Sequence, residues 1–156
     1  MPQTPRIYAD TSVYGGAFDA EFDRHSLAFF DQVRRGTLRL ITSPLVEDEL
    51  AGAPPQVRSL FDSLTPHLET VPVIPEAEDL QAAYLAAGIV SDRSAEDALH
   101  VALATVHPCP ILVSWNYKHI VHDEKSPRYN AVNTLRGRPT VAIHSPAEVV
   151  RYEEGL

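Results

Sequence analysis

Four side chains that lie far apart in the sequence have the oxygen atoms that hard divalent cations prefer: Asp10, Glu49, Asp97 and Asn116. Mg²⁺ and similar ions are bound in proteins by carboxylate and amide oxygens. A bound ion of this kind can activate water against a phosphodiester. If the fold brings these four positions together, the sequence predicts a catalytic metal site.

Each of the four residues also has an ordinary structural explanation. Asp10 and Asn116 each follow an apolar run and could cap a helix. Glu49 lies near the start of a helical segment, where acidic residues are generally favoured. Asp97 follows Ser94 by three residues, which partly matches a capping box. The spacing therefore predicts a site only when the four residues are taken together.

Polar neighbours of these residues are candidates for substrate binding. Thr11 and Ser12 directly follow Asp10, while Lys118 and His119 follow Asn116. A histidine three residues after Asn116 lies on the same face of a turn and could contact a phosphate or supply a proton. His100, three residues after Asp97, borders an apolar stripe, and we expect it to have a structural role.

Other hydrolytic sites and nucleotide sites lack their signatures. The sequence has neither a glycine-rich phosphate loop nor a serine nucleophile elbow. A zinc site is not indicated, because Cys109 is the only cysteine and the histidines do not match a zinc-ligand spacing. A single cysteine also excludes an intrachain disulfide and fits a reducing cytoplasm.

Short apolar runs alternate with amphipathic segments, which is typical of a three-layer α/β/α domain with a central, mainly parallel sheet. The predicted strands are Arg6–Ala9, Leu38–Thr42, Glu69–Ile74, Ile111–Ser114 and Thr140–His144. The predicted helices are Asp23–Arg35, Pro44–Ala51, Pro55–Leu64, Pro75–Ala87, Ala95–Val106, Asn116–His122 and Ala131–Leu135, and a turn is expected over Ser12–Ala17. Ligands bind such domains beyond the carboxyl ends of the strands, where we expect Asp10 and Asn116 to lie.

Composition limits the classes of protein that the chain could represent. Its 156 residues fit one domain, 1–156, and no apolar run is long enough to cross a membrane. The N-terminal Met1–Arg6 shows no apolar signal core, so we expect no export. A net charge of −8 argues against coating nucleic acid by bulk electrostatics, but it allows an enzyme whose acidic cluster binds cations. Cations are concentrated between positions 116 and 140, where they could contact a phosphate backbone.

Taken together, these segments resemble the PIN-domain family, and within it the VapC-like toxin ribonucleases of type II toxin–antitoxin systems. The similarity runs from Ile7 to Glu153 and rests on four motifs in a fairly specific order. The motifs are Tyr8-Ala9-Asp10-Thr11-Ser12, Ser43-Pro44-Leu45-Val46-Glu47-Asp48-Glu49-Leu50, Asp97-Ala98-Leu99-His100-Val101-Ala102 and Ser114-Trp115-Asn116-Tyr117-Lys118-His119.

The resemblance implies a five-stranded parallel sheet and a Mg²⁺- or Mn²⁺-dependent nuclease that cleaves RNA. It implies that Asp10, Glu49 and Asp97 hold the metal and act in catalysis with the fourth position, Asn116. That fourth position is usually Asp in the family, and the Ser-Trp-Asn sequence here is similar to a variant subgroup. We therefore expect weaker metal binding, above all of a second ion.

The resemblance also implies partners, and it leaves two other functions open. An antitoxin protein would cover the acidic site, and homodimers are common in the family. The apolar stretch of Tyr84, Leu85, Ile89 and Val90 could serve a dimer, although core packing explains it better. A PIN-like module that binds RNA or protein without hydrolysis is the main alternative. A hydrolase of small phosphate esters is a third.

Overall fold

The computed structural model describes residues 4–151 and contains five strands. Residues 1–3 and 152–156 lie outside the described part. Two predictions extend into them: the expectation of no export, which rests on Met1–Arg6, and the family resemblance, which runs to Glu153. The strands are β1 (Arg6–Ala9), β2 (Arg39–Thr42), β3 (Leu68–Thr70), β4 (Ile111–Val113) and β5 (Ala142–His144).

All neighbouring strands are parallel, in the order β3-β2-β1-β4-β5. β1 is central, and Tyr8 is in register with Ile41 of β2 and Leu112 of β4. After β1 the chain builds one half of the sheet through β2 and β3, then crosses to β4 on the other side. The carboxyl ends of β1 and β4 therefore flank the point where strand order reverses, the usual place for a ligand in such sheets.

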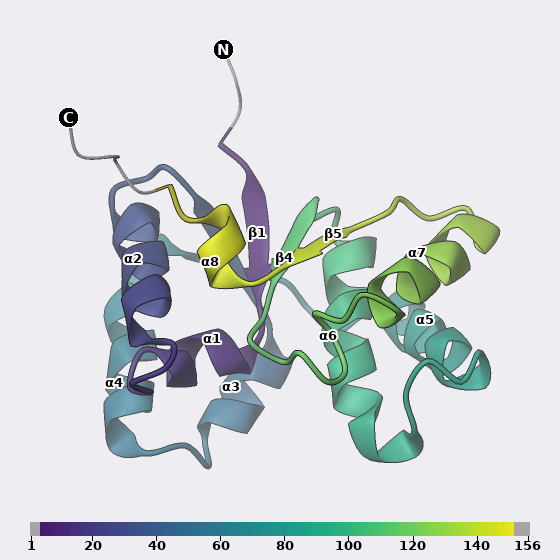
Figure 1. The fold of residues 1–156 in the computed structure, drawn as a ribbon, viewed down its shortest axis with the longest axis horizontal. Coiled ribbons are helices and arrows are strands. Elements are labelled where there is room, and N and C mark those ends of the chain that lie inside the picture. The colour runs from purple at the N-terminus through teal and green to yellow at the C-terminus, as the bar shows by residue number, and fades with distance from the viewer. Residues whose placement is uncertain (1–3, 152–156) are drawn as a thin grey trace.

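Helices cover both sides of the strands in Figure 1, with α1, α2, α4 and α8 drawn on one side and α5, α6 and α7 on the other. Their bounds are α1 (Thr11–Gly16), α2 (Asp23–Arg34), α3 (Pro44–Leu50), α4 (Pro55–Leu64), α5 (Pro75–Ala86), α6 (Ala95–Val106), α7 (Lys125–Leu135) and α8 (Pro146–Val149). Short 3₁₀ turns cover Thr65–His67 and Asp92–Ser94. The predicted α/β class and five-stranded parallel sheet are confirmed.

One predicted helix is wrong. Residues 116–122 form a turn rather than a helix. The side-chain Oδ1 of Asn116 accepts a hydrogen bond from His119 N at 2.9 Å, as an N-cap would. One bond of the α-helical type follows, from Ile120 N to the carbonyl oxygen of Asn116 at 3.1 Å, but the helix does not continue. Val121 N donates to the same oxygen at 2.8 Å and His122 N donates to the carbonyl oxygen of Ile120, which closes the segment as a turn.

Two boundaries and one additional helix differ from the prediction for local reasons. β3 ends at Thr70 because Pro72 cannot donate to a strand ladder. α7 begins at Lys125, six residues earlier than predicted, since Pro127 falls in its first turn, where a proline needs no N–H partner. The unpredicted α8 begins after Ser145, whose N–H donates to Glu148 Oε1 at 3.0 Å in a capping box.

The apolar stretch considered for dimerisation belongs to the core. Tyr84, Ile89 and Val90 are at most 6% exposed, and Leu85 packs against the same cluster. These side chains are therefore not available to a partner. Among the described residues, none of the helices has both the length and the apolar character needed to span a membrane.

Candidate active site

Asp10 lies directly after β1 and is held by hydrogen bonds from two serines. Its Oδ1 accepts from the backbone N–H and the hydroxyl of Ser12, at 3.1 and 2.5 Å, and its Oδ2 accepts from Ser114 Oγ at 2.7 Å. Only 4% of the residue is exposed. Burial raises the pKa of the Asp10 carboxyl, while these hydrogen bonds partly oppose the rise. The fold thus fixes this carboxylate firmly at the carboxyl end of the central strand.

Of the three acids of α3, only Glu49 makes described side-chain contacts with residues at this end of the sheet. Its Oε1 accepts from Thr11 Oγ1 at 2.8 Å and is 2.6 Å from His100 Nε2, whereas Glu47 and Asp48 are exposed. Burial alone would raise the pKa of Glu49, but the hydrogen bonds from His100 and Thr11 outweigh it and hold the pKa below its ordinary value. Glu49 therefore stays ionised at neutral pH.

Asp97 and Asn116 meet from α6 and from the turn after β4. A hydrogen bond from Asn116 lowers the pKa of Asp97, but burial has the larger effect and raises it overall. The backbone N–H of Asn116 donates to Ser114 Oγ at 2.9 Å, so the serine that binds Asp10 also positions Asn116. The Ser114 hydroxyl is therefore one of the links between the ends of β1 and β4.

Electrostatic coupling connects the three acids. The charge of Asp97 contributes to the raised pKa of Asp10, and the charge of Glu49 contributes to the raised pKa of Asp97. Like charges raise one another's pKa only when they are close. The acids predicted from widely separated sequence positions are therefore gathered at one edge of the sheet.

His119 and two lysines lie on the Asn116 side. Lys125 Nζ is 3.3 Å from His119 Nδ1, and Tyr129 donates to the carbonyl oxygen of His119 at 2.8 Å. Burial and then the positive charge of Lys125 lower the pKa of His119, and the charge of Asp97 opposes them. Lys118 is exposed and acts on the same imidazole by its charge.

The donor atoms suit Mg²⁺ or Mn²⁺, but they do not form a closed cage. No group of three His, Cys, Asp or Glu side chains between residues 4 and 151 is placed to hold an ion together. Mg²⁺ dehydrates reluctantly and is commonly bound by one or two carboxylates with several waters. Asp10, Glu49 and Asp97 fit an ion of that kind, held by some of them directly and by others through water.

Trp115 braces the turn that carries Asn116. Its backbone N–H donates to Ser12 Oγ at 2.9 Å, and its indole Nε1 donates to Ser26 Oγ at 2.8 Å. Phe22 stacks on the indole with ring centroids 4.3 Å apart. A Cβ on Gly16 would lie 2.6 Å from Nε1, so only glycine fits beneath the ring. Ser12, considered for substrate binding, uses its hydroxyl within the protein.

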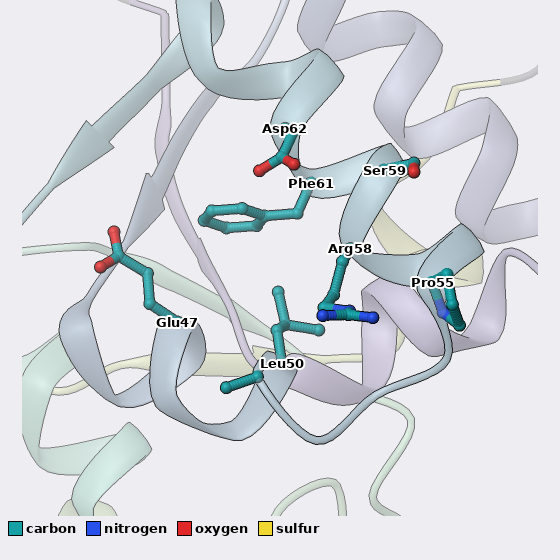
Figure 2. Close-up of a pocket in the computed structure, with 8 residues that line it drawn as sticks. Glu47, Leu50, Pro55, Arg58, Ser59, Phe61 and Asp62 are labelled. Atoms are coloured by element: carbon teal, nitrogen blue, oxygen red, sulfur yellow. The ribbon is translucent and has the colours of Figure 1, made fainter.

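A surface pocket of about 540 Å³ lies apart from the acids, between α3 and α4. Figure 2 shows Arg58 of α4 reaching towards Leu50 of α3, with Glu47 and Asp62 at the edges. None of the residues that line it is a predicted site residue; they are Glu47, Leu50, Ala51, Pro55, Arg58, Ser59, Phe61 and Asp62. The acidic cluster, and not this hollow, has the chemistry for hydrolysis.

The sequence did not indicate three residues that complete the site. Ser114 bonds both Asp10 and Asn116, His100 bonds Glu49, and Lys125 contacts His119. One feature of the sequence pointed to His100: it is a polar residue among apolar neighbours on a helix. Nothing local distinguishes Ser114 as a partner of Asp10, because that hydrogen bond spans 104 positions of the chain. Lys125 lies only six positions from His119, but it reaches the imidazole across a turn that was predicted as a helix.

Comparison with protein-family models finds no match, and comparison with curated proteins finds none either. Seventeen chains of solved structures match this fold. One belongs to VapBC2 from Rickettsia felis bound to a DNA fragment from its promoter, with a TM-score of 0.58 and 14% identity over 90% of this chain and 98% of that one.

Two further matches come from FitAB complexes. A chain of FitAcB from Neisseria gonorrhoeae has a TM-score of 0.58 and 15% identity, covering 92% of this chain and 99% of its own. A chain of FitAB bound to an IR36 DNA fragment has a TM-score of 0.56 and 14% identity, covering 96% and 99%. This chain shares their fold. At such low identity the likeness concerns the fold alone.

Proposed function

We propose that this protein is a metal-dependent ribonuclease that hydrolyses RNA phosphodiester bonds. The observation that carries the proposal is geometric. Thr11, the neighbour of Asp10, donates to Glu49, and Ser114 bonds both Asp10 and Asn116, whose side chain bonds Asp97. Burial raises the pKa of Asp10 and of Asp97, so their ionised forms cost stability, and a bound divalent cation would offset that cost. The same edge of the sheet is where this class of fold binds ligands.

Asp10, Glu49 and Asp97 would hold Mg²⁺ or Mn²⁺, with Asn116 contributing a neutral oxygen directly or through water. The ion would lower the pKa of a bound water and neutralise charge on the phosphate. Ser12 and Ser114 keep the Asp10 carboxylate in one orientation. Thr11 does the same for Glu49, so its predicted contact with substrate becomes a positioning role in this proposal.

His119 and two lysines would bind the RNA beside the acids. Lys125 has only protons to donate, so His119 Nδ1 accepts and the proton of the neutral imidazole lies on Nε2. This leaves Nε2–H as a donor to a phosphate oxygen or a leaving oxygen. Lys118, exposed on the same turn, adds a positive charge for the next phosphate.

We propose further that the protein is the toxin of a toxin–antitoxin pair. Solved complexes named VapBC2 and FitAB share its fold, and the sequence motifs resemble the VapC-like group. An antitoxin could inhibit the enzyme by placing a basic side chain among the carboxylates. We expect the protein to act in the cytoplasm as a homodimer.

The test is a calorimetric titration of Mn²⁺ and Mg²⁺ into the purified protein, combined with cleavage of single-stranded RNA. Asp10→Asn, Glu49→Gln and Asp97→Asn should each abolish cleavage and weaken metal binding. Glu47→Gln and Glu96→Gln are matched controls, since these exposed acids lie on the same helices, and both should behave as wild type. Full activity in purified Asp10→Asn and Asp97→Asn would refute the proposal.

The neutral Asn116 keeps one alternative open, a PIN-like module that binds RNA or protein without hydrolysing it. Its mark would be intact RNA binding with negligible metal affinity, even in a ternary titration with RNA. The third function, hydrolysis of small phosphate esters, is tested by comparing a panel of such esters with RNA. Hydrolysis of the esters without cleavage of RNA would support it.

A further inference from the structure

A buried chain of hydrogen bonds runs from the end of β2 to the carboxylate of Glu49. Ser43 Oγ is 2.8 Å from Tyr8 OH, Tyr8 OH is 2.8 Å from His100 Nδ1, and His100 Nε2 is 2.6 Å from Glu49 Oε1. Ser43, Tyr8 and His100 are at most 1% exposed. The chain of bonds therefore joins the end of β2, β1 and α6 through groups shielded from bulk water, and it reaches solvent only at Glu49 of α3.

The direction of the last bond follows from what each group can donate. An ionised carboxylate only accepts, so His100 Nε2 must carry a proton and donate to Glu49. In a neutral imidazole Nδ1 then accepts from Tyr8, whose phenol keeps its proton because burial raises its pKa well above the ordinary value. Tyr8 oxygen accepts in turn from Ser43. If the imidazole carried both protons, the Tyr8 and Ser43 bonds would reverse, but the bond to Glu49 would not.

Thr11 reaches the same carboxylate oxygen from the other side. Its Oγ1 donates to Glu49 Oε1 at 2.8 Å, so both hydrogen bonds end on Oε1. Two donors on one oxygen restrict the plane of the carboxylate, and no hydrogen bond within the described residues ends on Oε2. The Glu49 side chain is 28% exposed, which makes such fixing necessary for a defined geometry.

We propose that His100 is a positioning residue for the metal site: through Nε2–H it fixes the Glu49 carboxylate so that one oxygen, Oε2, is presented to the ion. This inference rests on the proposed metal-dependent function. It gives a functional reason for a histidine within the apolar face of α6, where a purely structural residue would be aliphatic. Groups that orient metal ligands typically change metal affinity by 10- to 100-fold when they are removed.

The experiment measures the Mn²⁺ dissociation constant of the whole protein by calorimetry. His100→Leu removes the donor at similar volume, and we expect it to weaken Mn²⁺ binding about 10- to 100-fold. His100→Gln restores an N–H near the position of Nε2 and should recover most of the loss. His107→Gln is the matched control: this histidine follows the same helix, bonds the carbonyl oxygen of Pro72, and should not affect the metal.

A double-mutant cycle separates positioning from a general loss of structure. In a Glu49→Gln background, His100→Leu should change Mn²⁺ affinity by less than about twofold, because His100 acts only through Glu49. An equal weakening in both backgrounds would refute the inference. If His100→Leu does not fold, His100→Asn, too short to reach Glu49, and Tyr8→Phe replace it. Unchanged affinity in both would refute the inference as well.

The two proposals fail differently. If wild type binds no Mn²⁺, alone or with RNA, the metal-dependent function is wrong and the role of His100 is wrong with it. If wild type binds Mn²⁺ and Glu49→Gln weakens it while His100→Leu binds as wild type does, only the role of His100 is wrong.

Discussion

Burial of Asp10 costs stability when its carboxyl group is ionised, and this cost can be measured. Burial raises its pKa in the folded protein, so the folded state prefers the protonated acid. When a group has a higher pKa in the folded state, the stability that it contributes is fully present at pH values below its unfolded pKa. That contribution is lost as the pH rises through the folded pKa. At pH 7 the ionised carboxylate therefore destabilises the metal-free protein.

Asp10→Asn should accordingly raise the melting temperature at pH 7 without divalent ions, by roughly 2–4 °C for each 1 kcal/mol gained. The difference should vanish near pH 3, where wild type is also neutral. Saturating Mn²⁺ should reverse the order, since an ion that binds only the folded state stabilises it. Thermal denaturation with and without Mn²⁺ at both pH values checks this, and a variant less stable than wild type in all conditions would contradict it.

Asn116→Asp restores a fourth acid beside Asp97. The new carboxylate can still accept from His119 N, but it can no longer donate to Asp97, and it adds a negative charge. We expect tighter Mn²⁺ binding, on the order of tenfold, because a nearby unit charge attracts the cation strongly. Calorimetry measures the affinity. No change would place Asn116 outside the coordination of the ion.

At the residue scale, the sequence predicted the types of the site residues but not their hydrogen-bond partners. Asp10, Glu49 and Asp97 could be selected because acids follow strands or border apolar helix faces. The bonds from Ser114 and His100 could not be predicted, since each spans a large separation in the chain. Only the folded backbone brings those donors within 3 Å of the carboxylates.

Gly16 ends α1 and leaves room for the indole that braces the Asn116 turn. An added Cβ would lie 2.6 Å from Trp115 Nε1 and 2.8 Å from Ser26 Oγ. Gly16→Ala should therefore displace the ring and cost about 1–3 kcal/mol, the usual effect of overpacking a core. Denaturant unfolding gives the stability, and Trp115 is the single tryptophan, so its fluorescence spectrum reports the displacement directly. Gly15→Ala, with no atom near its Cβ, is the control.

Three strands are tied at their amino-terminal side by ion pairs. Glu69 of β3 lies 2.7 Å from Arg6 of β1 and 2.8 Å from Arg39 of β2. The hydrogen bond from Arg6 lowers the pKa of Glu69 below its ordinary value of 4.5. Because the pKa of Glu69 is lower in the folded state, its contribution to stability is present above pH 4.5. That contribution is lost as the pH falls through the folded pKa.

Glu69→Gln should therefore weaken the pH dependence of unfolding below pH 4.5 and have little effect on it at higher pH. The total effect should stay near 1 kcal/mol or less, since the Glu69 side chain is 41% exposed and solvent screens the pairs. Urea unfolding at several pH values measures this. If the free energy of unfolding falls with pH below 4.5 in the variant just as it does in wild type, the ion pairs contribute nothing in solution.

At the scale of elements, hydrophobic periodicity predicted the five strands and the long helices α2, α4, α5 and α6, because burial on one or both faces determines those patterns. It predicted only the last five residues of α7. It failed where side-chain hydrogen bonds decide the local structure. Asn116 resembles an N-cap in the sequence, yet its carbonyl oxygen closes a turn instead of starting a helix. That turn carries Lys118 and His119, so the error fell on the loop that holds two of the predicted substrate-binding residues.

The whole molecule carries a net charge of −8, which limits how the proposed RNA substrate could bind. A polyanion approaching an acidic protein is repelled except where cations are concentrated. Lys118 and Lys125 are the cations of the candidate site, and the divalent ion would supply further positive charge. Affinity should therefore depend on a few contacts and on the metal rather than on an extended basic surface.

This gives a quantitative expectation for the salt dependence of RNA binding. For single strands, the slope of log K against log salt is about −0.7 for each neutralised phosphate. Two lysines predict a slope between about −1 and −2 for cleavage-deficient Asp10→Asn in the absence of divalent ions. Lys118→Ala should reduce its magnitude by about 0.7. Fluorescence anisotropy with labelled single-stranded RNA measures both values. A slope steeper than about −4 would require six or so phosphate contacts and would place the RNA path on another face of the molecule.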